Sequence, residues 1–153
     1  MTKLKKKKTI ILKDKIVNVL MKNGSKHTSE KILLKSSKLL QKSSKKNFQS
    51  LIQLAIINAT STFKLNEQIV KKSKRKSKKI TPSFILKNSL RTMTALKYIK
   101  TTVCKKGNSI GFHKNLTKEI LTSSSLKGQS VEQKTKLQVQ VLLNKRYLSK
   151  FKW

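Results

Sequence analysis

The run from Lys71 to Lys79 holds seven basic residues in nine positions, the densest concentration of reactive groups in this sequence. So many like charges cannot pack against their own protein, but they match a groove lined by phosphates. The alternative is an ordinary solvated loop, and the charge of the whole chain favours nucleic acid over it. The candidate nucleic-acid-binding residues of this run are Lys71, Lys72, Lys74, Arg75, Lys76, Lys78 and Lys79.

The charge of the whole chain points to the same partner. Its 153 residues include 38 Lys or Arg and only 5 Asp or Glu, which gives a formal net charge of +33. Rigid polyphosphate offsets such a charge best, because each bound phosphate releases condensed counterions. A second basic run near the N-terminus is less specific, since basic tails are common. Its candidates are Lys3, Lys5, Lys6, Lys7 and Lys8.

A third cationic feature is the turn from Lys22 to Lys26. Asn23 and Gly24 favour the left-handed backbone that ends a helix. The next helix then begins with free backbone N–H groups, which bind phosphate well. An ordinary helix–helix connection is the simpler interpretation, and these five residues alone favour it.

The residue types that support catalysis or metal binding in other proteins are scattered along this chain. His27, His113 and Cys104 lack the spacing of a zinc site, and a single cysteine excludes an intramolecular disulfide. There is no glycine-rich phosphate loop and no nucleophile elbow. We therefore expect no enzyme, no metal and no cofactor. Acid–base catalysis needs paired titrating groups, whereas the acidic residues lie far apart, at Asp14, Glu30, Glu67, Glu119 and Glu132.

Neither a membrane span nor a cleaved signal is expected. The apolar run Ile10–Leu12 is too short for either. A membrane-active cationic protein would carry its lysines along strongly amphipathic helices, whereas the lysines here concentrate in loops and tails.

Aromatic residues alternate with cations at the C-terminus, where Tyr147, Phe151 and Trp153 follow Lys145 and Arg146. Such rings can stack on unpaired bases, close the core at a helix end or pack on a neighbouring protein. We favour packing for Tyr147 and leave Trp153 open.

Apolar spacing predicts the elements that position these residues. Helical spacing is found over about 12–21, 28–42, 48–59, 87–105, 112–123 and 130–149, with Asn47 and Asn88 as N-caps. Alternating residues on both sides of the basic run predict a hairpin arm over about 61–86, in which Pro82 lies at an edge or an end. Inward positions include Leu90, Met93, Leu96, Ile99 and Val103 in the fourth helix and Val131, Leu137, Val141 and Leu142 in the last.

The predicted fold is mainly α, a bundle of about six helices with a basic β hairpin between the third and the fourth. We expect residues 1–13 to form a basic N-terminal arm and residues 14–153 a single helical domain, which is large enough to bury a modest core.

Four segments, in order, resemble the ribosomal protein S-seven family of the small-subunit head. They are Val17–Lys26 followed by Ser29–Ile32, then Leu54–Ala59, Ala95–Ile99 and Asn144–Trp153. The family pattern for the first is N-x-L/I-M-x-x-G-K-K, and for the last N-R-A-F-A-H-Y-R-W. Each match is short, but together they span nearly the whole chain.

The resemblance implies a function in translation, with small-subunit rRNA as the partner. The arm, the turn after the first helix, the hairpin and the start of the fourth helix then face rRNA. The hairpin is expected near the exit-site tRNA and the mRNA, and the neighbours are proteins S-nine and S-eleven. Carried over by position, the rRNA-facing residues are Lys22, Lys26, Arg75, Lys76, Lys78, Lys87 and Arg91.

The chain also departs from the family pattern. The hairpin lacks the family's two glycines, and lysine replaces most of its arginines, which exchanges a bidentate fork for a point charge. Such drift suits an organellar ribosome, first a mitochondrial one and second one of a plastid-type organelle. The alternative function is a nucleoid or histone-like DNA-compacting protein, which shares the charge but needs none of the ordered motifs.

Overall fold

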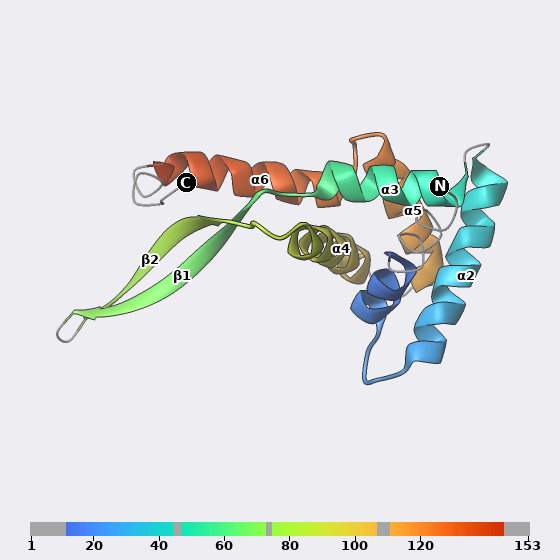
Figure 1. The fold of residues 1–153 in the computed structure, drawn as a ribbon, viewed down its shortest axis with the longest axis horizontal. Coiled ribbons are helices and arrows are strands. Elements are labelled where there is room, and N and C mark those ends of the chain that lie inside the picture. The colour runs from blue at the N-terminus through green and yellow to red at the C-terminus, as the bar shows by residue number, and fades with distance from the viewer. Residues whose placement is uncertain (1–11, 45–46, 73–74, 107–110, 146–153) are drawn as a thin grey trace.

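The chain folds into a helical body from which a β hairpin projects (Figure 1). The computed structural model describes residues 12–44, 47–72, 75–106 and 111–145. This confirms the predicted mainly helical fold, with six helices and a hairpin between the third and fourth. The elements are a helix over residues 12–20, then α2 (Lys26–Ser43), α3 (Phe48–Ala59), β1 (Phe63–Lys72), β2 (Arg75–Phe84), α4 (Asn88–Lys105), α5 (Phe112–Ser124) and α6 (Gln129–Leu143).

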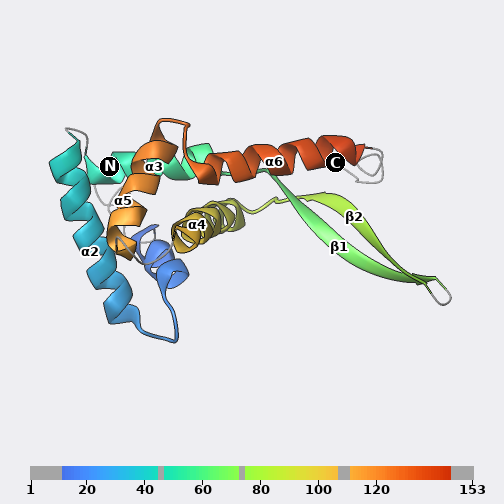
Figure 2. The same ribbon diagram turned by 180° about the vertical axis from the view of Figure 1, so that it is seen from behind.

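The hairpin and α2 lie at opposite ends of the molecule, as the views from the front and from behind both show (Figures 1 and 2). Helix α6 runs from the body toward the hairpin, and it packs against β1 as well as α3, α4 and α5. None of the described helices covers the far half of the hairpin (Figure 1). Among the described helices, none combines the length and the apolar character needed to cross a bilayer.

The core is built from the apolar faces that the helical spacing predicts. The first helix and α2 through α5 all contribute to one buried cluster. The chain has only three alanines, and all three are fully buried, where a small side chain lets helix backbones approach one another. Those three are Ala55, Ala59 and Ala95.

Two leucines that we predicted to point inward are instead at the surface. Leu90 is 53% exposed, and it lies nine residues before the buried Ile99, which at about 100° per residue puts it on the opposite face of α4. Leu142 is 65% exposed in the last turn of α6, where that helix extends away from the body (Figure 1). The apolar spacing runs along the whole of each helix, but the body covers only part of each helix.

The helix ends agree with the sequence in part. Asn23 and Gly24 have φ of 52° and 73°, the left-handed conformation expected after the first helix, and Asn47 is the residue before α3. Asn88 is not a cap, because Lys87 occupies that position and Asn88 is already helical. Helix α6 ends at Leu143 rather than at the predicted Ser149. The C-terminal aromatic residues lie outside the described part of the chain.

Candidate nucleic-acid interface

The hairpin is a long two-stranded ribbon that carries most of the basic run in its strands. The antiparallel register runs from Phe63 opposite Phe84 to Lys72 opposite Arg75. Ten residues per strand at about 3.3 Å each give a length of about 30 Å. The predicted strands were shorter, with the basic run as a separate tip, and that boundary was wrong. Pro82 lies within β2, which is an edge strand, as expected.

The register places cations directly opposite one another toward the end of the hairpin. Lys71 pairs with Lys76, and Lys72 pairs with Arg75. Like charges in directly opposed positions destabilise a ribbon, and the hairpin carries a single acidic residue, Glu67, to offset them. A bound polyanion would remove this repulsion, so the strand pairing itself favours a phosphate-bearing partner.

The base of the hairpin is closed by contacts between its two ends and is tied to the body through α4, neither of which sequence patterns show. The rings of Phe63 and Phe84 have centroids 4.6 Å apart, and the Ile85 N–H donates to the Thr62 carbonyl over 2.8 Å. Arg91, predicted to face rRNA, is half-buried and donates from Nε to the Ile85 carbonyl over 2.7 Å. This bond ties the start of α4 to the end of β2.

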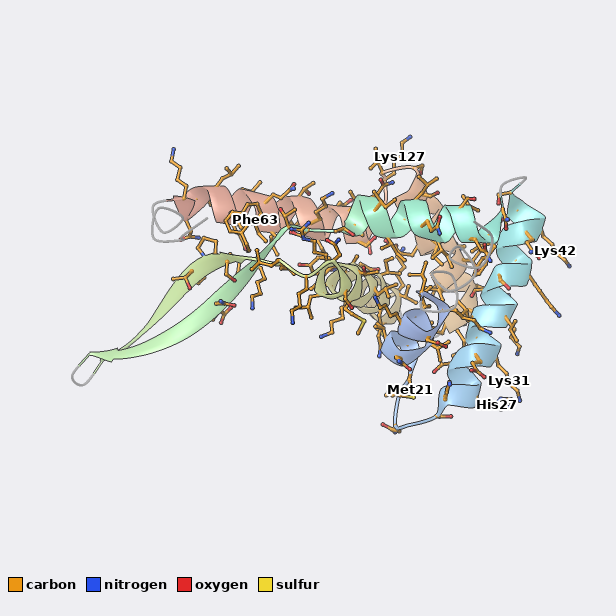
Figure 3. The ribbon with its side chains drawn as sticks, viewed as in Figure 1. Met21, His27, Lys31, Lys42, Phe63 and Lys127 are labelled. Carbon is orange, nitrogen blue, oxygen red and sulfur yellow. The ribbon has the colours of Figure 1, made fainter. Side chains whose placement is uncertain are left out.

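The predicted site residues do not all gather in one place. Lys87 is exposed at the start of α4, beside the hairpin base, whereas Lys22 and Lys26 are exposed around the turn that precedes α2. Figure 3 labels Met21 and His27, which flank this turn, and Phe63 at the hairpin base, at separate ends of the body. The predicted lysines Lys3, Lys5, Lys6, Lys7, Lys8 and Lys74 lie outside the described residues.

The turn before α2 is braced by its own side chains. The Thr28 hydroxyl lies 2.8 Å from both the carbonyl and the hydroxyl oxygen of Ser25, and the Ser29 hydroxyl donates to the same carbonyl over 3.1 Å. These bonds hold the chain in the geometry of a plain helix–helix connection. They also leave the ammonium groups of Lys22 and Lys26 exposed on either side of it.

Three lysines that sequence reasoning did not single out hold the body together. Lys100 Nζ donates over 2.6 Å to the carbonyl of Val19, at the end of the first helix, and Lys134 Nζ donates over 2.9 Å to that of Asn58, near the end of α3. Cations at helix C-termini satisfy free carbonyls and oppose the helix dipole. The third, Lys106, pairs with Glu119 over 2.8 Å.

Glu119 joins three helices in the interior. Its side chain is fully buried in α5, and besides Lys106 at the end of α4 it accepts the backbone N–H of Ser130, in the first turn of α6, over 3.0 Å. The Ser123 hydroxyl completes the site, at 3.2 Å from the carboxylate and 2.7 Å from the Ser130 hydroxyl. Every polar group of this junction therefore has an internal partner.

The surroundings of Glu119 lower the pKa of its carboxyl group. Burial by itself would raise the pKa of this carboxyl, but the hydrogen bonds from Lys106 and Ser130 and the charge of Lys106 outweigh burial, and the pKa lies below its ordinary value. A sequence signal was present, because Glu119 shares its helix face with the buried Leu116 and Ile120. Within the described residues, no cluster of three or more His, Cys, Asp or Glu side chains is placed to hold a metal ion.

Comparison with known proteins agrees with the fold and the charge. The sequence model of the family described as Ribosomal protein S7p/S5e matches residues 2–143. The chain belongs to this family. No curated protein matches the chain in a sequence search.

Membership of the S7p/S5e family fixes the broad function. The chain is a small-subunit ribosomal protein with a role in translation, in a family that binds rRNA alongside other ribosomal proteins. The family consists of structural proteins of the ribosome and is not a family of enzymes.

Proposed function

We propose that this protein binds small-subunit rRNA through three basic surfaces and nucleates assembly of the head of the subunit. The surfaces are the hairpin and the turn before α2, both within the single domain of residues 14–153, and the N-terminal arm over residues 1–13. The observation that carries the proposal is the register of the hairpin, which sets Lys71 opposite Lys76 and Lys72 opposite Arg75 on a projecting ribbon. Neutralising phosphates supplies most of the affinity, and the shape of the RNA supplies specificity.

The individual residues divide by what they offer to RNA. The exposed Lys22, Lys26 and Lys87 present point charges to phosphates. We give Arg91 a double function: its Nε is bound to the hairpin base, and we assign its remaining N–H groups to RNA phosphates. We assign the same phosphate contacts to the arm and the hairpin, with Lys3, Lys5, Lys6, Lys7, Lys8, Lys71, Lys72, Lys74, Arg75, Lys76, Lys78 and Lys79.

The proposal extends to the surroundings of the protein. By resemblance to the family, the hairpin lies near the exit-site tRNA and the mRNA path, with proteins S-nine and S-eleven as neighbours. We place the protein in the mitochondrial ribosome, and a plastid-type organelle is the alternative. The abundance of lysine over arginine, 35 against 3, supports an organellar form that has drifted from the family pattern.

A salt titration tests the hairpin as an RNA-binding element. Binding to transcribed small-subunit rRNA is measured for the wild-type chain and for the variant K71Q/K72Q/R75Q/K76Q. Because each lost phosphate contact reduces the slope of log K against log salt by about 0.7–0.9, we expect the slope to fall by about 3. A matched control, K97Q/K118Q/K127Q/K136Q, removes four exposed lysines outside the proposed surfaces and should change the slope little.

Two outcomes of this titration would contradict the proposal. One is a wild-type affinity for rRNA that does not depend on salt. The other is displacement of the rRNA by duplex DNA in competition, which would favour a DNA-compacting protein. The cellular location has its own measurement, a sucrose gradient of mitochondrial lysate, in which the chain should sediment with the small subunit.

A further inference from the structure

A stripe of four lysines runs along the outer side of α2, at the opposite end of the molecule from the hairpin, so the lysines are not confined to loops and tails as the sequence suggested. Lys31, Lys35, Lys38 and Lys42 are all exposed and fall within an arc of about 60° at about 100° per residue. This arc lies directly opposite the buried side of the helix, formed by Ser29, Leu33, Ser36 and Leu40. Figure 3 shows Lys31 and Lys42 projecting outward from α2.

The stripe has no internal counter-charge. Its members are separated by four, three and four positions, so each faces a like charge one turn away, an arrangement that opposes helix formation. The single acidic residue of α2, Glu30, lies outside the arc and is half-buried, and the first turn of the helix holds no acidic residue. An ordinary solvated helix would alternate acidic and basic residues here, so the missing negative charge points to a partner.

The chemistry of the stripe selects RNA over a protein as that partner. Within the arc there are only lysines, whereas protein–protein interfaces have an apolar centre and are depleted in lysine. Lysine ammonium groups bind phosphates as point charges. The stripe is about 16 Å long, at about 1.5 Å per residue from Lys31 to Lys42, and such a straight row suits the phosphate backbone of a double-helical segment.

We infer that the lysine stripe of α2 is a further RNA-binding surface, which binds the phosphate backbone of an RNA helix without regard to sequence. This inference rests on the proposed function, because it takes the chain to be an rRNA-binding protein. Because α2 and the hairpin are at opposite ends of the molecule (Figures 1 and 2), the two surfaces contact different segments of the RNA and hold them at a fixed separation.

Hydroxyl-radical footprinting on transcribed small-subunit rRNA, combined with salt titration, tests this assignment. The stripe variant K31Q/K35Q/K38Q/K42Q should lose protection of one RNA segment and reduce the salt slope by about 3. It should keep protection of a different segment, the one that the hairpin variant K71Q/K72Q/R75Q/K76Q loses. The control K97Q/K118Q/K127Q/K136Q, with the same change in charge, should keep both segments. The charge-conserving variant K31R/K35R/K38R/K42R should also keep both.

The results separate this inference from the proposed function. If the wild-type protein protects no segment of the rRNA, both the proposed function and the α2 surface are overturned. If the hairpin variant is impaired but the stripe variant keeps normal protection and a normal salt slope, only the assignment of the α2 stripe is overturned. The same conclusion holds if the stripe variant keeps its RNA protection but loses a protein neighbour on a gradient. Circular dichroism at low salt serves as the folding control, and the stripe variant should be as helical as the wild type or more so, since it lacks the repulsion.

Discussion

The junction around Glu119 and the β hairpin deal with charge in opposite ways. At the junction, a buried carboxylate is surrounded by donors from α4, α5 and α6, and each of them is within 3.2 Å. In the hairpin, the register brings lysine opposite lysine and lysine opposite arginine, on a ribbon whose far half none of the described helices covers. The junction thus completes its electrostatics internally, while the hairpin depends on a partner to do so.

The same division sorts the lysines of the chain. Lys100, Lys106 and Lys134 are bound to carbonyl or carboxylate oxygens of the body and contribute to folding. The exposed lysines of the turn before α2 and of the α2 stripe extend into solvent. A substitution in the first group should therefore change stability, and one in the second should change RNA affinity.

The largest effect is expected for Glu119→Ala. The substitution leaves the Ser130 N–H and the Ser123 hydroxyl without their buried acceptor and leaves Lys106 without its counter-charge. Because Lys106 is partly exposed and can be solvated, the cost comes from the lost buried hydrogen bonds and should be about 3 kcal/mol of unfolding free energy. Urea denaturation followed by circular dichroism measures it. Glu132→Ala removes an exposed carboxylate from the first turn of α6 and should cost less than about 1 kcal/mol; equal losses would contradict the comparison.

Gly128→Ala should have the next largest effect, because the backbone here has no room for a side chain. A Cβ atom at this position would lie 2.2 Å from Ser123 Oγ and 2.9 Å from the Ser123 backbone. Since the close atoms include backbone, relief requires α5 and α6 to separate, at a cost of about 2 kcal/mol. The thermal midpoint measures the loss, with Ser125→Ala at an exposed neighbouring position as the control, expected within about 0.5 kcal/mol. An unchanged midpoint would mean that the junction is loosely packed.

The sequence predicted the outline of both regions but not what stabilises them. Helical spacing located the six helices, and alternation around a basic run located the hairpin. The bonds that fix the elements relative to one another join residues far apart in the chain, such as the Asn58 side-chain amide and the Ser123 carbonyl, or Lys100 and Val19. No local pattern encodes such a pairing, so it had to come from the structure.

The misassigned residues show a different limit. Leu90 and Leu142 match an apolar spacing, but burial also needs a neighbouring element, and that neighbour is set by the tertiary fold. The lysine stripe of α2 is the converse case. Its spacing was visible in the sequence, but its meaning depended on knowing that the opposite face of the helix is the buried one.

Acid should weaken the junction around Glu119. Because the folded pKa of Glu119 is lowered, the unfolded chain binds a proton more readily. The stability that Glu119 contributes is complete above its unfolded pKa of about 4.3 and is lost as the pH falls through the lower folded value. The difference in unfolding free energy between the wild type and E119Q, measured in urea from pH 6 downward, should therefore shrink below about pH 4.3. A constant difference would contradict this account.

The smallest effect concerns the attachment of the hairpin, through Arg91→Ala. Losing the bond from Arg91 Nε to the Ile85 carbonyl should cost about 1 kcal/mol locally, with little change in global unfolding, since the hairpin adds few contacts to the core. Hydrogen exchange at the Ile85 amide, which is bonded to Thr62, should become about fivefold faster. Lys97→Ala removes an equal charge from an exposed position on the same helix and should leave this rate unchanged. If both variants behave alike, Arg91 acts only as a charge and the hairpin is oriented by its aromatic base and by α6.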